Sequence, residues 1–144
     1  MIVKIRVFIP LFTCDTVQRA VSVAQTLFPE ASFINTTSAK ETIDHLDKRE
    51  YDLPQLILLD VDLKQSVGGL DLLPQLIERF KGHVPIIIFS GIGDELTVHQ
   101  AYERGAVAYT KKPSDLQGWK NYVAAMRDYW YGTTRLPTID PSFD

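Results

Sequence analysis

The chain has 144 residues, of which 45% are hydrophobic and 23% charged, and 15 Lys and Arg against 18 Asp and Glu give a formal net charge of −3. This length and composition are typical of one globular domain. The acidic balance argues against the basic face that nucleic-acid binding requires. The single cysteine, Cys14, excludes an internal disulfide and a cysteine-based metal cage. No apolar run has the length of a membrane helix or the pattern of a signal peptide, so we expect a cytoplasmic protein with neither nucleic-acid nor membrane partners.

Five apolar, β-branched runs alternate with helical patterns along the chain. The apolar runs cover residues 2–9, 31–34, 56–59, 84–89 and 106–110; the helical patterns cover 16–28, a segment from 38, a segment over 70–77, about 94–103, and a segment that opens near 114 or 115. Pro29 ends the first helix, and Ser38 with Glu41 forms a capping box at the start of the second. Five β–α units of this kind predict an α/β fold, a parallel sheet with helices on both faces.

Three polar residues follow apolar runs at positions where such folds carry their chemistry. The run 56–59 is unbroken, as in a strand buried on both faces, and Asp60 follows it. Ser90 and Lys112 follow the fourth and fifth runs. Ligands of open α/β sheets bind at the carboxyl ends of the strands, so we expect these three side chains at one edge.

A carboxylate, a hydroxyl and an ammonium together suit phosphoryl transfer. An aspartate such as Asp60 can form an aspartyl phosphate, and Ser90 and Lys112 would stabilise the phosphoryl oxygens. A buried Asp–Lys pair with a purely structural role would give the same residues, so the residue types alone leave both readings open. A nucleotide-binding enzyme is disfavoured because the sequence has no phosphate-binding glycine loop. Neither Trp119 nor Trp130 is expected at this edge.

Three segments resemble the receiver domain of response regulators, the phospho-accepting module of two-component signalling. Residues 56–60 with 69–73 look like its acceptor strand and the helix that follows; 85–91 look like its fourth strand with a Ser or Thr; 105–113 look like its Gly-Ala…Tyr…Lys-Pro segment. The segments have the family's order and spacing. The resemblance implies a flavodoxin-like fold, a doubly wound five-stranded parallel sheet with strand order 2-1-3-4-5, and a receiver domain over 1–131 followed by a tail over 132–144.

The resemblance also implies a role for each matching residue. Asp60 would be the phosphorylated aspartate, Ser90 would bond the phosphoryl group, and Lys112 would pair with it. Tyr109 would be the aromatic switch that turns inward as Ser90 moves, although a partly buried strand aromatic would look the same. A cis peptide bond is implied before Pro113.

The stretch after the first run departs from the family. Residues 9–15 read IPLFTCD and lack the adjacent acidic pair that holds Mg²⁺ in receivers. Asp15 is the nearby carboxylate, either as the N-cap of the first helix or as a lone metal ligand. Asp62 stands where the family offers a backbone carbonyl to the metal. We therefore expect Mg²⁺ on Asp60, with Asp15 and Asp62 as candidate ligands, and weakened or absent binding if the pocket is degenerate.

Two functions remain open at this point, and neither is an enzyme. One is a single-domain response regulator of a phosphorelay, which takes a phosphoryl group on Asp60 from a histidine kinase or phosphotransfer protein and signals through protein contacts. The other is a degenerate pseudo-receiver that binds partners without being phosphorylated. Because the sequence ends at Asp144, we expect no DNA-binding output domain. Residues 129–137 resemble the ending of small standalone receivers that partner phytochrome-type histidine kinases.

The last helix carries the aromatic residues that offer anchors for a partner: Trp119, Tyr122, Tyr129, Trp130 and Tyr131. In the family, the fourth helix, fifth strand and fifth helix form the usual contact face, so a homodimer through this face is one expectation. The alternative is that these aromatics pack the last helix on the sheet.

Overall fold

The computed structural model describes residues 5–10, 17–48, 53–61, 69–91 and 93–137. Strands and helices alternate along these residues as the sequence predicts. The elements are β1 (Ile5–Ile9), α1 (Val17–Leu27), β2 (Ala31–Asn35), α2 (Ala39–Asp47), β3 (Leu56–Asp60), α3 (Gly69–Phe80), β4 (Ile86–Ser90), α4 (Glu95–Glu103), β5 (Ala108–Lys111) and α5 (Leu116–Trp130).

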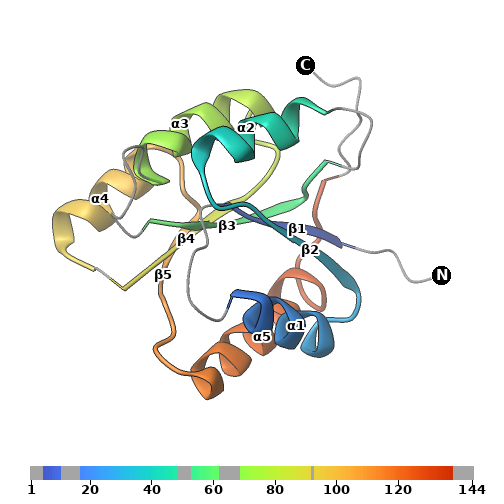
Figure 1. The fold of residues 1–144 in the computed structure, drawn as a ribbon. Coiled ribbons are helices and arrows are strands. Elements are labelled where there is room, and N and C mark those ends of the chain that lie inside the picture. The colour runs from blue at the N-terminus through green and yellow to red at the C-terminus, as the bar shows by residue number, and fades with distance from the viewer. Residues whose placement is uncertain (1–4, 11–16, 49–52, 62–68, 92, 138–144) are drawn as a thin grey trace.

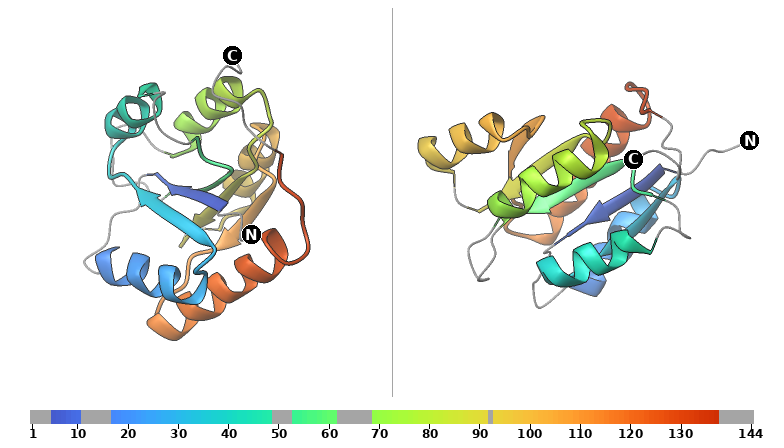
Figure 2. Two further views of the ribbon diagram at one scale, coloured as in Figure 1. Left: turned by 90° about the vertical axis from the view of Figure 1, so that its right-hand side faces the viewer. Right: turned by 90° about the horizontal axis from the view of Figure 1, so that it is seen from above.

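The five strands form one parallel sheet with the order β2-β1-β3-β4-β5 (Figure 1). Helices α2, α3 and α4 cover one face of this sheet, and α1 and α5 cover the other (Figures 1 and 2). The expected doubly wound, flavodoxin-like fold and its strand order are therefore confirmed. The order places β3 in the centre, between β1 and β4, so the end of β3 is flanked on both sides.

Each face of the sheet has its own hydrophobic cluster, and alternate residues of a strand contribute to opposite clusters. In β3, Leu59 belongs to the cluster under α2, α3 and α4, whereas Leu58 belongs to the cluster under α1 and α5. In β4, Ile88 and Phe89 divide in the same way. All five residues of β3 and of β4 are buried, which explains why these strands are continuous apolar runs.

Side-chain caps fix where three of the described helices begin, namely α2, α4 and α5. The Ser38 hydroxyl accepts a hydrogen bond from the Glu41 N–H at 3.0 Å, as the predicted capping box requires. Glu41 in turn accepts from the Thr37 N–H at 3.2 Å, one residue before the partner that the motif predicts. Helix α5 follows Asp115, whose carboxylate accepts from the Gly118 N–H at 2.7 Å. Each cap satisfies a backbone donor that has no partner within its helix.

Helix α3 contains a proline in its interior, Pro74. A proline has no N–H, so it cannot donate to the carbonyl four residues earlier, which belongs to Leu70. The Leu70 carbonyl instead accepts from Nη1 of Arg104, at the C-terminal end of α4, at 2.8 Å. Arg104 also lies 3.7 Å from the Asp71 carboxylate. One side chain of α4 therefore replaces a missing bond within α3 and ties the two helices together.

The chain after α5 stays in contact with the domain. The Thr134 N–H donates to the Tyr129 carbonyl at 2.7 Å, and Leu136 packs against the cluster under α1 and α5. Arg127 on α5 makes a double ion pair with Glu30, at 2.7 and 2.8 Å. No helix in the described ranges has the length and apolarity needed to cross a membrane.

Candidate functional site

Three strand ends bring the predicted phosphoryl-binding residues to the same edge of the sheet. Asp60 ends β3 and Ser90 ends the adjacent β4, and each is 3% exposed. Lys112 follows β5 directly, and its N–H donates to the Ser90 carbonyl at 2.9 Å. This bond extends the β4–β5 pairing past the last strand residue and fixes the backbone from which the Lys112 side chain extends.

Asp60 and Lys112 form a buried ion pair. The Lys112 Nζ lies 2.7 Å from Oδ2 of Asp60, and the two side chains are 19% and 2% exposed, respectively. A charge-assisted bond of this length is strong, and in a buried setting neither charge can lose its partner without a large cost. The carboxylate that the sequence predicts as phospho-acceptor is thus held neutralised by the predicted phosphoryl-binding lysine.

An aromatic residue lies under this ion pair. The Lys112 Nζ is 5.7 Å from the ring centroid of Phe89, which is fully buried. Phe89 contacts Tyr122 of α5 at 6.2 Å between centroids, and Tyr122 stacks on Trp119 at 5.8 Å and 11°. Phe89 was not among the residues predicted at this edge. Its signal was in the pairing register, since Phe89 lies directly opposite Asp60.

Tyr122 is fixed by a hydrogen bond from α5 to the sheet. Its hydroxyl lies 2.8 Å from Oγ1 of Thr110, and that Oγ1 is 2.9 Å from the Ile88 carbonyl, to which it donates. Burial raises the pKa of Tyr122 to about 12, while the bond to Thr110 acts in the opposite direction. The Trp119 indole N–H donates to the Ala20 carbonyl of α1 at 2.8 Å. The layer beneath the site is therefore held by directed polar bonds as well as by packing.

The residue expected to act as a switch lies on the other face of the sheet. Tyr109 is partly buried and packs against the cluster under α2, α3 and α4. Its backbone N–H donates to the hydroxyl of Tyr102 on α4 at 3.1 Å. Because side chains alternate along a strand, Ser90 belongs to the same face as Ile88, which lies opposite Tyr109 in the register. Ser90 and Tyr109 thus share the α4 side of the sheet.

The α3 helix begins against the backbone of Asp60, and a glycine makes this approach possible. A Cβ atom on Gly69 would lie 2.7 Å from the Asp60 carbonyl oxygen and 3.0 Å from Cγ2 of Val61. Gly69 is buried and is the first residue of α3. The close approach fixes the start of α3 beside the predicted phospho-acceptor.

The described residues do not by themselves make a magnesium site. They contain no group of three or more His, Cys, Asp or Glu side chains that would hold a metal. β1 is followed by the buried Pro10, whose carbonyl accepts from the Asp60 N–H at 3.4 Å. Pro10 offers no carboxylate, the stretch 9–15 lacks the acidic pair of the family, and Oδ2 of Asp60 already pairs with Lys112. The candidate ligands Asp15 and Asp62 lie outside the described residues.

One expectation from the resemblance is wrong. The described part of the chain has no cis peptide bond, so the bond between Lys112 and Pro113 is trans. The trans form is the lower-energy form even before proline, by about 0.5–1 kcal/mol.

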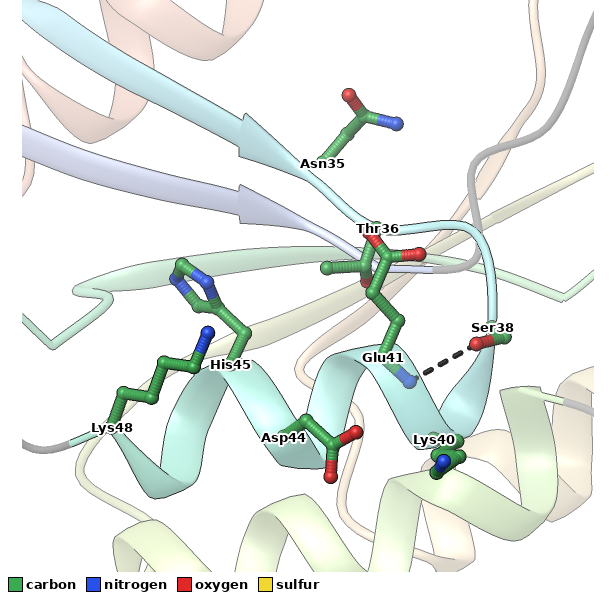
Figure 3. A pocket seen from close by; sticks show the side chains of 8 residues that line it. All are labelled: Asn35, Thr36, Ser38, Lys40, Glu41, Asp44, His45 and Lys48. Carbon is green, nitrogen blue, oxygen red and sulfur yellow. Dashed lines mark hydrogen bonds between the residues drawn. The ribbon is translucent and has the colours of Figure 1, made fainter.

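A polar hollow of about 420 Å³ lies beside the end of β2 and along α2 (Figure 3). Its lining carries both signs of charge and comprises Asn35, Thr36, Ser38, Lys40, Glu41, Asp44, His45 and Lys48. Several of these side chains have structural partners, since Ser38 caps α2 and the Thr36 hydroxyl lies 2.6 Å from that of Thr42. The described lining includes neither Asp60 nor Lys112, so this hollow is distinct from the candidate site.

The family model described as the response regulator receiver domain matches residues 12–124. The chain belongs to this family, as the resemblance of its motifs implied. The match begins after β1, the strand whose end departs from the family pattern. Receiver domains are signalling modules of two-component systems, and phosphorylation and Mg²⁺ binding are typical of them.

Solved structures of response regulators share the fold. The Mn²⁺-bound form of response regulator Rcp1 is 20% identical, with a TM-score of 0.76 over 92% of this chain and 99% of that chain. Response regulator RPA3017, in red light signalling of R. palustris, is 18% identical, with a TM-score of 0.78 over 94% and 100%. The phosphorylated cyanobacterial phytochrome response regulator RcpA is 18% identical, with a TM-score of 0.78 over 94% and 99%. At such identities the likeness concerns the fold alone.

Proposed function

We propose that this chain is a single-domain response regulator of a phosphorelay that accepts a phosphoryl group on Asp60. The observation that carries the proposal is the buried Asp60–Lys112 pair, with the buried Ser90 at the end of the adjacent strand, in a chain of the receiver family. A structural ion pair alone would not require a hydroxyl at the end of the adjacent strand. The working division is a receiver domain over 1–131 and a tail over 132–144, in a cytoplasmic protein.

In the proposed transfer, a carboxylate oxygen of Asp60 attacks the phosphorus of a phosphohistidine on the donor protein. The new O–P bond forms as the P–N bond breaks, and the leaving imidazole nitrogen takes up a proton. The Lys112 ammonium moves its bond from the carboxylate to a phosphoryl oxygen and neutralises part of its charge. The Ser90 hydroxyl donates to another phosphoryl oxygen. Tyr109, on the same face as Ser90, changes its packing against α4 in response.

Mg²⁺ is the cofactor that the family implies, and it would neutralise charge on the phosphoryl oxygens. Asp60 would hold it with Asp15 and the backbone of Asp62. Without the acidic pair, we expect a lower Mg²⁺ affinity than in receivers that have it. Lys112 then carries a larger share of the charge neutralisation at Asp60.

The test is intact-mass spectrometry after incubation with acetyl phosphate, in parallel with the Asp60→Asn variant. We expect a single phosphoryl adduct on the natural chain and none on the variant. Parallel samples with Mg²⁺ and with a chelator measure how far the reaction depends on the metal, and we expect a slower reaction in the chelator. An unmodified protein that is shown by circular dichroism to be folded would contradict the proposal.

The second candidate function is a pseudo-receiver that binds its partner unmodified. It is favoured by one observation, the absence of the acidic pair from residues 9–15, the stretch in which receivers carry it. In this case Asp60 and Lys112 would be a structural pair. The same mass measurement separates the two candidates, because a pseudo-receiver gives no adduct and its Asp60→Asn variant keeps its binding partners.

We further propose a histidine kinase or phosphotransfer protein as donor and a homodimer through α4, β5 and α5. Three apolar side chains on this face are half-exposed or more: Leu96, Tyr102 and Val107. The aromatics near α5 divide between the two alternatives that the sequence left open. Tyr129 is 53% exposed, whereas the others pack against the cluster under α1 and α5. Sedimentation equilibrium of the natural chain and of Tyr102→Ser, each with and without acetyl phosphate, tests the dimer.

A further inference from the structure

Phe89 lies between the strand that carries Asp60 and the strand that leads to Lys112. In the register, Phe89 is opposite Asp60 on β3 and opposite Thr110 on β5. Side chains two residues apart share a face, so Lys112 follows Thr110 on that face. The Lys112 side chain therefore extends across the Phe89 position to reach Asp60, and its Nζ ends 5.7 Å from the Phe89 ring centroid and 2.7 Å from Oδ2 of Asp60.

The Phe89 ring is a suitable support for an ammonium group. A cation within about 6 Å of an aromatic centroid is attracted by the ring quadrupole, more strongly where water is excluded. Phe89 is fully buried, and the Lys112 side chain is 19% exposed, so little water reaches the space between them. Tyr122 packs against the ring, and its hydroxyl bond to Thr110 holds it in place.

We propose that Phe89 is a positioning residue of the phospho-acceptor site, which holds the Lys112 ammonium against Asp60. Phe89 makes no contact with the phosphoryl group and acts through Lys112. As far as the reaction is concerned, this inference rests on the proposed phosphorylation of Asp60. The structural part, the confinement of Lys112, is independent of phosphorylation and has its own test.

The test compares Phe89→Leu with Phe28→Leu in the full chain. Both phenylalanines are buried in the cluster under α1 and α5, but Phe28 packs against Phe33 and Tyr131, away from the site. The two variants therefore lose the same ring from the same cluster, and Phe28→Leu reports what a lost ring does through stability alone. Phe89→Met is a second variant, which fills the space with a flexible side chain should Phe89→Leu fold poorly.

The first readout is the rate at which an amine-reactive ester labels Lys112, followed by peptide mass spectrometry. Exposed Lys111 on the same peptide serves as the internal reference. In the natural chain Lys112 should react more slowly than Lys111. We expect Phe89→Leu to raise the Lys112:Lys111 ratio by roughly tenfold, and Phe28→Leu to leave it unchanged. An unchanged ratio in a folded Phe89 variant would overturn the inference.

The second readout is the rate of phosphorylation by acetyl phosphate at saturating donor. We expect Phe89→Leu to slow it by roughly tenfold and Phe28→Leu by less than twofold. A natural chain that takes up no phosphoryl group refutes the proposed function, while the labelling ratio still decides the role of Phe89. Equal slowing in the two phenylalanine variants would show that Phe89 acts only through stability, and would overturn its positioning role.

Discussion

The two faces of the sheet are built differently. Under α1 and α5 the cluster is aromatic and is crossed by directed bonds, from Trp119 to the Ala20 carbonyl and from Tyr122 to Thr110. Under α4 the cover is thin, since Ala101 is the buried residue of that helix and its other apolar side chains are partly or largely exposed. The α5 side therefore holds the layer beneath the site by directed bonds, whereas α4 is held on the sheet by few buried apolar side chains.

The largest loss of stability is expected when Trp119, the buried residue that bonds α5 to α1, is removed. Trp119→Ala deletes a buried side chain and its bond to α1, and we expect a loss of about 3–5 kcal/mol in the free energy of unfolding. Leu96→Ala on the exposed surface of α4 is the control, with an expected change within about 0.5 kcal/mol. Urea unfolding followed by circular dichroism measures both. Similar losses in the two variants would remove the proposed difference between the faces.

A second test concerns the start of α3, where Gly69 approaches the backbone of Asp60. Gly69→Ala places a Cβ within 2.7 Å of the Asp60 carbonyl oxygen. The start of α3 must then move, and we expect a loss of about 1–3 kcal/mol in the free energy of unfolding. Gly93→Ala is the matched control, because a Cβ there meets nothing within 4 Å. If Gly69→Ala is as stable as Gly93→Ala, the close approach of α3 to Asp60 does not constrain the fold.

A third test uses pH to probe the polar bonds under the site. The pKa of Tyr122 is raised to about 12 in the folded protein, against about 10 in an unfolded chain. Folding therefore favours the neutral phenol. This contribution to stability is complete below pH 10 and is lost as the pH rises from about 10 to about 12.

In Tyr122→Phe the stability should no longer fall with pH through this group. The variant should also be less stable at neutral pH by about 1 kcal/mol, because the bond to Thr110 is gone. The measurement is urea unfolding between pH 8 and 12. If the free energy of unfolding falls equally with pH in the natural chain and in Tyr122→Phe, a group other than Tyr122 causes the loss of stability at alkaline pH. Thr110→Val is the complementary variant, since it removes the same bond and keeps the phenol.

The smallest expected effect is at the tie between α4 and α3. Arg104→Gln removes the donor to the Leu70 carbonyl, which lies near the surface, where water can replace the arginine. We expect a cost of about 0.5 kcal/mol but faster amide hydrogen exchange along α4. Exchange in α5 should stay as it was, and uniform acceleration in both helices would contradict the proposed difference between the two faces.

The element order and the site edge could be predicted from sequence, because apolar periodicity and the residue after each run are local properties. Strand ends were predicted less well. Val84 and Ala106 are buried but lie outside β4 and β5, since burial extends past the hydrogen-bonded ladder. Phe89 under Lys112 was missed because that contact depends on the pairing register of three strands, which no local pattern contains.

The missing acidic pair and the peptide bond before Pro113 also show what the sequence could and could not predict. The sequence shows that the residues after Ile9 lack a carboxylate pair, and the structure adds that Pro10 is buried next to the Asp60 backbone. The trans bond before Pro113 corrects an inference that rested on resemblance alone. A match to a family motif therefore predicted where a residue lies in the fold better than it predicted the isomer of a peptide bond.

Pro74 and Arg104 make two distant positions depend on each other. The Leu70 carbonyl can be satisfied from within α3, by the N–H of any residue other than proline at 74, or from outside by Arg104. In a Pro74→Ala background, Arg104→Gln should therefore cost less than it does in the natural chain. Among descendants of this sequence, a change at one of the two positions alters which residues the other tolerates, although the two belong to different helices.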